Sequence, residues 1–509
     1  MPDLTVRKIF SLLFLFFISD NQLNAQILPK EGSSLNYRLV GFQFPTMPGE
    51  VYKLEIAEGN YCSPDLFKQN ITLSLNCKTN KIIAEVPAFG KQYTWRVVTR
   101  NNKSVAAVEL HHFNTATIEN VDTGLTRLRI LKHAETHNSA YVFIDDTRTL
   151  YDMNGQPVWF LPNIEHFPND HFEVRNLNLT PQGTITFILG DMAYEVNYNA
   201  DIIWKAPTNG KASGGNYGGY HHQVTRLPNG HYMLLGNEDI LCKKPSANGG
   251  SFTIIGDDKI VGDKNGGYIK VPFGTIIEYD EQGNVVWLWK SSAYFKGSDI
   301  VYHKKTNGTP EVISHENAFY FDEKNKVVNI SFRNISRILK VKYPEGNVIS
   351  SYGEIFEPGV PEKGNGLFCH QHSCRISEQG YLYLFNNNLC NHGAPPEIIM
   401  MQEPVSEKGK LKKIWEYACT IDGIEDSEKK APYQFKSGGN VIELPDHSFF
   451  AAMSAPYYSK VFIVDRDKRI LWSAVPEKKN PGNEKWEISS LYEASIINTP
   501  EELEHLVWH

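Results

Sequence analysis

Residues 276–290 read IIEYDEQGNVVWLWK, which is an apolar strand, a tight polar turn and a second strand that ends in aromatic residues. Alternating runs of this kind that stop at Asp, Gly or Asn predict a β-hairpin. The element recurs along the chain and makes six copies, in residues 150–161, 194–205, 276–290, 338–353, 412–417 (a degenerate copy) and 461–473.

Six repeated hairpins indicate a repeat architecture. A unit of a few short strands cannot bury both faces of its sheet alone, and radial stacking of such units solves this problem. A two-sheet sandwich also uses hairpins, but it does not explain why the same turn pattern recurs. We therefore predict an all-β fold whose main domain, residues 117–475, is a six-bladed β-propeller.

The segments outside these repeats have their own patterns. Residues 27–116 contain short alternating strands separated by turns, which predicts a small N-terminal β-sandwich; additional strands of the main domain are the alternative. Residues 476–509 form a C-terminal extension that either caps a blade or mediates a dimer contact. Residues 241–269, rich in Gly, Lys and Asp, are an insertion expected to form a loop over one rim.

The beginning of the chain predicts export. Arg7 and Lys8 precede an apolar run over residues 9–18, and Ala25 offers a small residue for cleavage, so residues 1–25 resemble a secretory signal peptide. A membrane anchor or an amphipathic helix is the alternative, but a bilayer span needs about 20 apolar residues. We expect a periplasmic or secreted protein without a stable membrane anchor. The net charge of −7 does not indicate a nucleic-acid partner.

The chain has seven cysteines. In an oxidising compartment they can form disulfides, and the pairs close in sequence are Cys62 with Cys77 and Cys369 with Cys374. Their number is odd, so at least one thiol stays unpaired. No Cys/His spacing of the zinc type occurs, so we expect no structural metal site.

A second repeated element places polar residues where each innermost strand begins. It reads HHQVTRLPNGHYMLL in residues 221–235, QHSCRISEQGYLYLF in residues 371–385 and RNLNLTPQGTITFIL in residues 175–189. In a propeller these positions face the central channel, so their side chains converge on one small volume. The candidates at these positions are Arg175, His221, His222, His315 and His372.

Of the two adjacent histidines, His222 is the preferred candidate. It precedes Gly230 by the same eight positions that separate His372 from Gly380. Because a slip of one residue turns a strand's side chains to the other face, His221 remains the alternative.

The motifs around these residues resemble those of the bacterial aryl-sulfate sulfotransferases. They are His222 leading into LPNG, His315 followed by Glu316-Asn317, Arg333 within VVNISFRNISRILKV, and Gln371-His372 leading into GYLYLFNNN. The resemblance extends over about residues 118–475, and that family also carries a small N-terminal β-sandwich. Because members of the family can be homodimers, a homodimer is one of the assembly states that the resemblance allows.

The resemblance implies transfer of a sulfuryl group from a phenolic sulfate ester to a phenolic acceptor, with no nucleotide sulfate donor and no cofactor. It implies that His372 is the nucleophile, transiently sulfated on a ring nitrogen; a neutral imidazole is competent for this near pH 7. Arg333 suits the sulfuryl oxygens, and His222 and His315 would donate to them or to the leaving oxygen. Asn317 would orient an imidazole or bind an oxygen, unless it serves a turn; His221, if it replaces His222, would bind substrate.

Two other classes of function remain open. Three histidines can ligate a divalent ion, as in a metal-dependent propeller lyase or hydrolase. Against this, Arg333 beside a cation would be unfavourable. A non-enzymatic exported propeller that captures a ligand is the other alternative, because a fold alone does not define a function.

Overall fold

The structure is a computed structural model. The residues that it describes are 26–46, 51–100, 105–107, 109–117, 126–164, 173–208, 219–243, 253–254, 268–295, 302–304, 310–312, 314–353, 367–391, 393–405, 409–421, 438–454, 459–480, 482 and 484–508. The predicted signal peptide at residues 1–25 lies outside the described residues, and so does most of the predicted insertion at residues 241–269.

The described chain is nearly all β, which confirms the all-β prediction. It divides into two compact units. The described residues of the first unit lie within 26–33, 41–82 and 93–113, and those of the second within 34–40, 83–92 and 114–508.

The N-terminal strands form two antiparallel sheets. The larger has the order β1-β8-β6-β3-β4 with β7 paired to β6, and the smaller pairs β2 with β5. These elements are β1 (Ser33–Leu35), β2 (Leu39–Gln43), β3 (Val51–Glu58), α1 (Pro64–Gln69), β4 (Leu73–Cys77), β5 (Lys81–Glu85), β6 (Gln92–Arg100), β7 (Val105–Ala107) and β8 (His111–Thr115).

Among the described residues of the second unit, six sheets have four or more strands, and most are built from strands consecutive in the chain. The first three sheets contain β10 (Tyr141–Ile144), β11 (Thr149–Asp152) and β12 (Pro157–Phe160); β13 (Val174–Leu179), β14 (Ile185–Leu189), β15 (Met192–Val196) and β16 (Ile202–Lys205); and β17 (Val224–Arg226), β18 (Tyr232–Lys243), β19 (Thr253–Ile254), β20 (Tyr268–Tyr279) and β21 (Val285–Lys290).

The other three sheets follow in the same manner. They contain β24 (Glu316–Asp322), β25 (Val327–Phe332), β26 (Arg337–Lys342) and β27 (Val348–Tyr352); β28 (His372–Ile376), β29 (Leu382–Asn386), β30 (Glu397–Gln402) and β31 (Lys412–Ala418); and β9 (Thr126–Lys132), β32 (Asn440–Glu443), β33 (Phe449–Met453), β34 (Lys460–Val464), β35 (Ile470–Lys479) and β36 (Trp486–Ile488). A short 3₁₀ turn, η1 (Ser291–Ala293), follows β21, and β22 (Tyr302–Lys304) pairs with β23 (Pro310–Val312).

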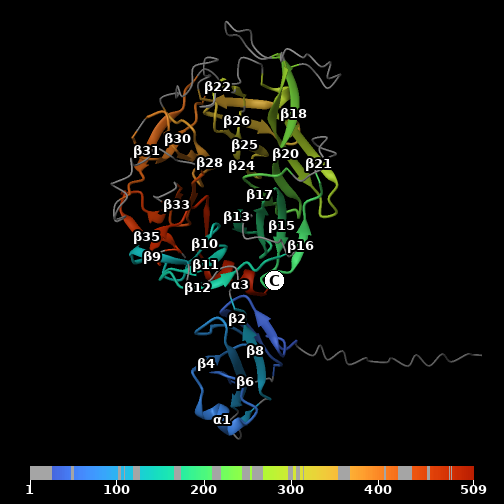
Figure 1. Cartoon of the computed structure of the whole chain (residues 1–509), viewed down its shortest axis with the longest axis vertical. Helices are drawn as coiled ribbons and strands as arrows, with labels where there is room; N and C mark the ends of the chain where they lie inside the picture. The colour runs from blue at the N-terminus through green and yellow to red at the C-terminus, as the bar shows by residue number, and fades with distance from the viewer. Residues whose placement is uncertain are drawn as a thin grey trace, which may run out of the picture. The chain divides into compact units, whose positions relative to one another are not determined.

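The six sheets follow one another in sequence order around a common centre, with β13, β17, β24 and β28 on the inner side (Figure 1). Each predicted hairpin contributes to the outer side of a sheet: residues 276–290 form β20 and β21, and residues 461–473 run from β34 into β35. The core lies between consecutive sheets. Leu235 of β18, for example, belongs to the same buried cluster as Ile330 and Leu339.

The two ends of this unit complete two of its sheets. β37 (Ala494–Ile497), from the predicted C-terminal extension, pairs antiparallel with β10, with Ile144 opposite Ala494. β9 pairs with β35 of the last sheet. The chain then ends in α3 (Pro500–Trp508). These pairings cover sheet edges that would otherwise leave backbone N–H and C=O groups unpaired, and they carry residues 489–493 toward the centre.

Candidate active site

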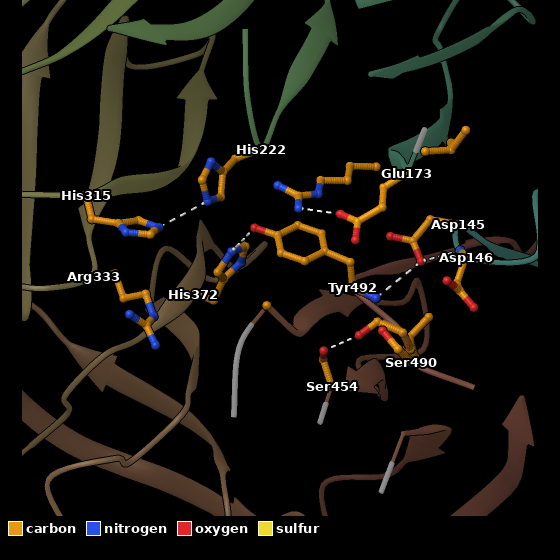
Figure 2. Close-up of a pocket in the computed structure, with 14 residues that line it drawn as sticks. Asp145, Asp146, Glu173, His222, His315, Arg333, His372, Ser454, Ser490 and Tyr492 are labelled. Carbon is orange, nitrogen blue, oxygen red and sulfur yellow. Dashed lines mark hydrogen bonds and ion pairs between the residues drawn. The ribbon is translucent and has the colours of Figure 1, made fainter. Parts of the chain in front are cut away.

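A cavity of about 360 Å³ lies where several innermost strands begin. It is lined by Asp145, Asp146, Glu173, Val174, Arg175, His222, His315, Arg333, His372, Gly438, Ser454, Ser490, Leu491 and Tyr492. Its size is in the range of pockets that hold one small organic ligand. Figure 2 shows His222, His315, His372 and Arg333 converging on it from separate strands.

Three of the predicted histidines meet in this cavity. The Nε2 atoms of His222 and His315 are 3.2 Å apart, and the ring centres of His222 and His372 are 6.1 Å apart. A contact between two ring nitrogens requires one imidazole to donate and the other to accept. His222 and His315 therefore share one proton and leave ring edges directed at the same small volume.

The backbone at these positions is locally irregular. His222 and His315 have φ values of 62° and 57°, a left-handed region that non-glycine residues seldom adopt. Pairing shifts register between Glu316 and Ala318 in β24, and between His372 and Arg375 in β28. Such bulges redirect a side chain from the sheet face, and strained residues of this kind cluster at functional sites. The strand starts thereby aim their histidines at the centre.

Burial keeps these imidazoles neutral. It lowers the pKa of His372 to about 3, and the electrostatic influence of His315 and Arg333 acts in the same direction. Burial and the nearby Arg333 likewise lower the pKa of His315 to about 3. The pKa of His222 also lies well below its usual value, again because of burial first and then its histidine neighbours. Near pH 7 these histidines offer lone pairs and N–H donors without positive charge.

His372 is enclosed by two residues from the C-terminal part of the chain. Its Nε2 lies 2.9 Å from the hydroxyl of Tyr492, and its Nδ1 lies 3.3 Å from Oε1 of Glu493. The His372 side chain is 1% exposed, so these two contacts dominate its polar surroundings.

Two guanidinium groups supply positive charge to the cavity. Arg333 follows β25, and its Nη1 donates to Asn334 Oδ1 at 3.1 Å. The guanidinium of Arg175 lies over the Tyr492 ring, 4.8 Å from its centre, and donates to Glu173 at 2.5 Å. The cavity therefore holds two guanidinium groups from separate parts of the chain together with the carboxyl groups of Asp145, Asp146 and Glu173.

The remaining predicted site residues lie behind this layer. Nδ1 of His221 is 2.6 Å from Nδ1 of His222, but His221 does not line the cavity. Burial lowers the pKa of His221 to about 4. Asn317 is also outside the cavity lining; its amide donates to the backbone carbonyl of Gln371 at 2.8 Å, immediately before His372.

Sequence reasoning missed Tyr492 and Glu493. They lie within residues 476–509, the predicted C-terminal extension, and β37 brings them to the centre by pairing with β10. The repeat pattern stops before them, so spacing gave no signal. One sequence feature could have suggested that the end of the chain completes the first sheet: a short apolar strand segment, residues 494–497, follows the last repeat.

The predicted disulfide pairing is wrong. Cys369 is bonded to Cys390, whereas Cys374 is a buried free thiol. Cys62 and Cys77 are also unpaired. Cys374 lies inside β28, where its side chain joins a hydrophobic cluster between sheets, so it faces away from the loop that carries Cys390. The bridge still ties down the segment just before His372.

Removing this bridge is expected to lower stability. The bond closes a loop with a sequence separation of 21, and the loss of loop-closure entropy corresponds to about 3 kcal/mol. Urea unfolding of Cys390→Ser should show a free energy of unfolding lower by about that amount. Cys62→Ser, which changes an exposed free thiol, is the matched control. An unchanged midpoint for Cys390→Ser would contradict the stabilising role.

Two features of the described residues bear on other classes of function. No three His, Cys, Asp or Glu side chains in the described ranges are grouped as a metal ion would require. None of the helices among these residues is long and apolar enough to cross a membrane.

Comparison with known proteins finds a family similar to part of the chain. The family model described as arylsulfotransferase (ASST) matches residues 245–418, a segment that contains His315, Arg333 and His372. Over this segment, which is less than half of the chain, the sequence is similar to the arylsulfotransferases. The matched segment excludes His222, Arg175 and Tyr492, which the structure nevertheless brings to the same cavity. A search of curated proteins found no match.

Solved structures show only distant similarity. A protein of unknown function from Bacteroides caccae is 10% identical, over 74% of this chain and 99% of that chain, with a TM-score of 0.36. A quinonprotein alcohol dehydrogenase-like protein from Bacteroides thetaiotaomicron is 11% identical, over 91% and 99%, with a TM-score of 0.31. Values this low carry no argument about the function of this chain.

Proposed function

We propose that this protein is an aryl-sulfate sulfotransferase that moves a sulfuryl group from a phenolic sulfate ester to a phenolic acceptor through a sulfohistidine at His372. The family match supports sulfotransferase activity in general. The proposal for the chemistry is carried by one observation: a buried neutral imidazole shares its cavity with two guanidinium groups and two further neutral imidazoles.

The nucleophile is Nε2 of His372. A neutral ring with a free Nε2 lone pair can attack sulfur without first losing a proton. The new N–S bond forms as the S–O bond to the aryl group breaks, and the phenolate leaves with that electron pair. The hydroxyl of Tyr492, which contacts Nε2 in this structure, makes way for the sulfuryl group.

Positive and N–H-bearing side chains stabilise the transferring group. The planar fork of Arg333 matches the oxygens of a sulfuryl group, whose negative charge is spread over three atoms. The ring that donates in the His222–His315 pair can turn its N–H toward the departing phenolate oxygen. Such donors act strongly here because the imidazoles of the site are buried and poorly solvated.

The second half of the reaction reverses these steps. The acceptor hydroxyl attacks sulfur, the N–S bond breaks, and its electron pair returns to Nε2. The accepting nitrogen of the His222–His315 pair takes the acceptor's proton as the new O–S bond forms and passes it to solvent after product release. No nucleotide sulfate donor takes part.

We further propose the finer architecture that suits this site. Six sheets in sequence order around a centre support a six-bladed β-propeller, and the two sheets of the N-terminal residues support a small β-sandwich. Export, inferred from residues 1–25, would place the enzyme where aryl sulfates arrive from outside the cell.

The direct test uses nitrophenyl sulfate as donor and phenol as acceptor. We expect nitrophenol release that depends on phenol and persists with a chelator. Without acceptor, mass spectrometry should find one sulfuryl group on the peptide that contains His372. No transfer from a panel of aryl sulfates, or activity only with an added divalent metal, would reject the proposal.

A further inference from the structure

Glu493 contacts His372 but lies outside the cavity lining. Its Oε1 is 3.3 Å from Nδ1 of His372, yet Glu493 does not line the cavity and cannot touch a substrate there. It lines a separate small space beside Asn178 and Arg375. Its role in the reaction must therefore act through His372.

We propose that Glu493 is a positioning residue whose carboxylate selects the reactive tautomer of His372. The inference rests on the proposed function, because it concerns the nucleophile of that reaction. When Glu493 is ionised, its negative charge 3.3 Å from Nδ1 holds the ring proton on that nitrogen, which has no hydrogen-bond partner among the described residues, and Nε2 keeps its lone pair toward the cavity. When Glu493 is protonated, its hydroxyl donates to Nδ1, the ring proton moves to Nε2, and attack is blocked.

The same carboxylate balances the charge that the reaction creates. Attack through Nε2 turns the neutral ring into a cationic N-sulfoimidazolium that still carries its proton on Nδ1. A carboxylate in contact with that nitrogen stabilises the cation, and burial strengthens the interaction because water does not screen it. The contact is already present in the resting enzyme, but its full charge–charge attraction arises only as the ring becomes cationic, so it lowers the barrier without tightening substrate binding.

Several charged groups around Glu493 control its ionisation. Burial raises the pKa of Glu493 to about 7, while hydrogen bonding to Asn176 and the charges of Arg375 and Arg175 lower it. The backbone N–H of Glu493 also donates to Asp145 Oδ2 at 2.7 Å. His372 itself, with its pKa near 3, does not change charge between pH 6 and 8. Over that window the carboxyl of Glu493 changes from mostly protonated to mostly ionised, so the rate should rise with pH.

The orientation of Asn176 makes the inference sharply testable. Its Oδ1 accepts from the backbone N–H of Val224 at 3.0 Å, so its amide nitrogen faces Glu493 and donates to Oε2 at 3.0 Å. In Glu493→Gln, the new carbonyl oxygen must take that donor. The new NH₂ group then faces Nδ1 of His372 and donates to it, which holds the ring proton on Nε2.

Glu493→Gln is therefore expected to lower kcat by about 100-fold or more, with little change in KM, because the ring is kept in the wrong tautomer. The rising limb of the pH profile between pH 6 and 8 should disappear.

In the double variant Asn176→Asp/Glu493→Gln, the carboxylate introduced at position 176 can only accept hydrogen bonds. It therefore binds the new NH₂ group and turns the new amide carbonyl toward Nδ1 of His372. We expect the double variant to recover at least about tenfold in kcat over the single variant.

A spectroscopic measurement of the His372 tautomer tests the same inference without catalysis. With ¹⁵N-labelled histidine, and His372→Gln to assign the signal, the wild-type ring should be protonated on Nδ1 at pH 8 and on Nε2 at pH 6. Glu493→Gln should show the Nε2–H form at both pH values. This arm uses the wild type first, so it remains decisive if a variant does not fold.

Three results would overturn the inference: wild-type kcat in Glu493→Gln, an Nδ1–H ring in that variant, or a wild-type tautomer that does not change with pH. If the wild type transfers no sulfuryl group at all, the proposed function fails instead, and the tautomer measurement still reports on Glu493 independently.

Discussion

His372→Asn is expected to lower kcat by at least about 10⁴-fold, because the variant retains the cavity and its donors but has no nitrogen lone pair that can accept a sulfuryl group. Asn keeps most of the buried volume, which limits the cavity left by the change. Initial rates of phenol-dependent nitrophenol release would measure the effect. Circular dichroism and a thermal melt would show that the variant is folded.

Two controls separate loss of the nucleophile from a general disturbance. His447→Asn alters a half-exposed histidine that is bound to Gln379 and lies outside the cavity lining, and it should keep the wild-type rate. His372→Gly supplied with free imidazole should regain part of its activity, because the added ring can occupy the vacated space. Activity of His372→Asn within tenfold of wild type would show that another group accepts the sulfuryl group.

Arg333→Gln is expected to lower kcat by about 10²- to 10³-fold, the usual cost of removing a preorganised donor to a charged transition state. Burial lowers the pKa of Arg333, but a guanidinium starts so high that it stays charged. Arg333→Lys should keep part of the rate, because it retains a charge but loses the planar fork. The series Arg, Lys, Gln should therefore decline in that order when kcat is measured at saturating donor.

Arg469→Gln is the matched control for this series. Arg469 lies on the surface, where its side chain is 71% exposed and pairs with Asp465, so its loss should not change the rate. If Arg333→Gln lost stability but kept its kcat, Arg333 would be a structural residue of the turn between β25 and β26 rather than a ligand of the sulfuryl group.

Much of the molecule could be predicted from local pattern. The hairpin in residues 276–290 and its repeats follow from alternation and turn residues, which depend on neighbours in sequence, and the structure forms them as β20–β21 and their counterparts. The convergence of His222, His315 and His372 could be predicted too, because equivalent positions of repeated units stack around the same centre.

Prediction failed where contacts depend on segments far apart in the chain. Cys369 pairs with Cys390 rather than with Cys374, because the facing of Cys374 in β28 is decided by packing between sheets. The role predicted for Asn317, orienting an imidazole or binding an oxygen, stays a prediction; its amide donates to the carbonyl just before His372, in a direction set by a bulge in β24. Neither outcome can be read from spacing.

By itself, the sequence determined the all-β class, the hairpin repeats and the histidines that share one cavity, since these follow from periodicity within each repeat. Only the tertiary structure decided what surrounds His372. Tyr492 and Glu493 reach it because β37 completes the sheet of β10, a strand about 350 residues earlier in the chain. Pairing an exposed strand edge stabilises the fold whatever the sequence distance between the strands. No local sequence pattern therefore indicates which residues this pairing brings to the site.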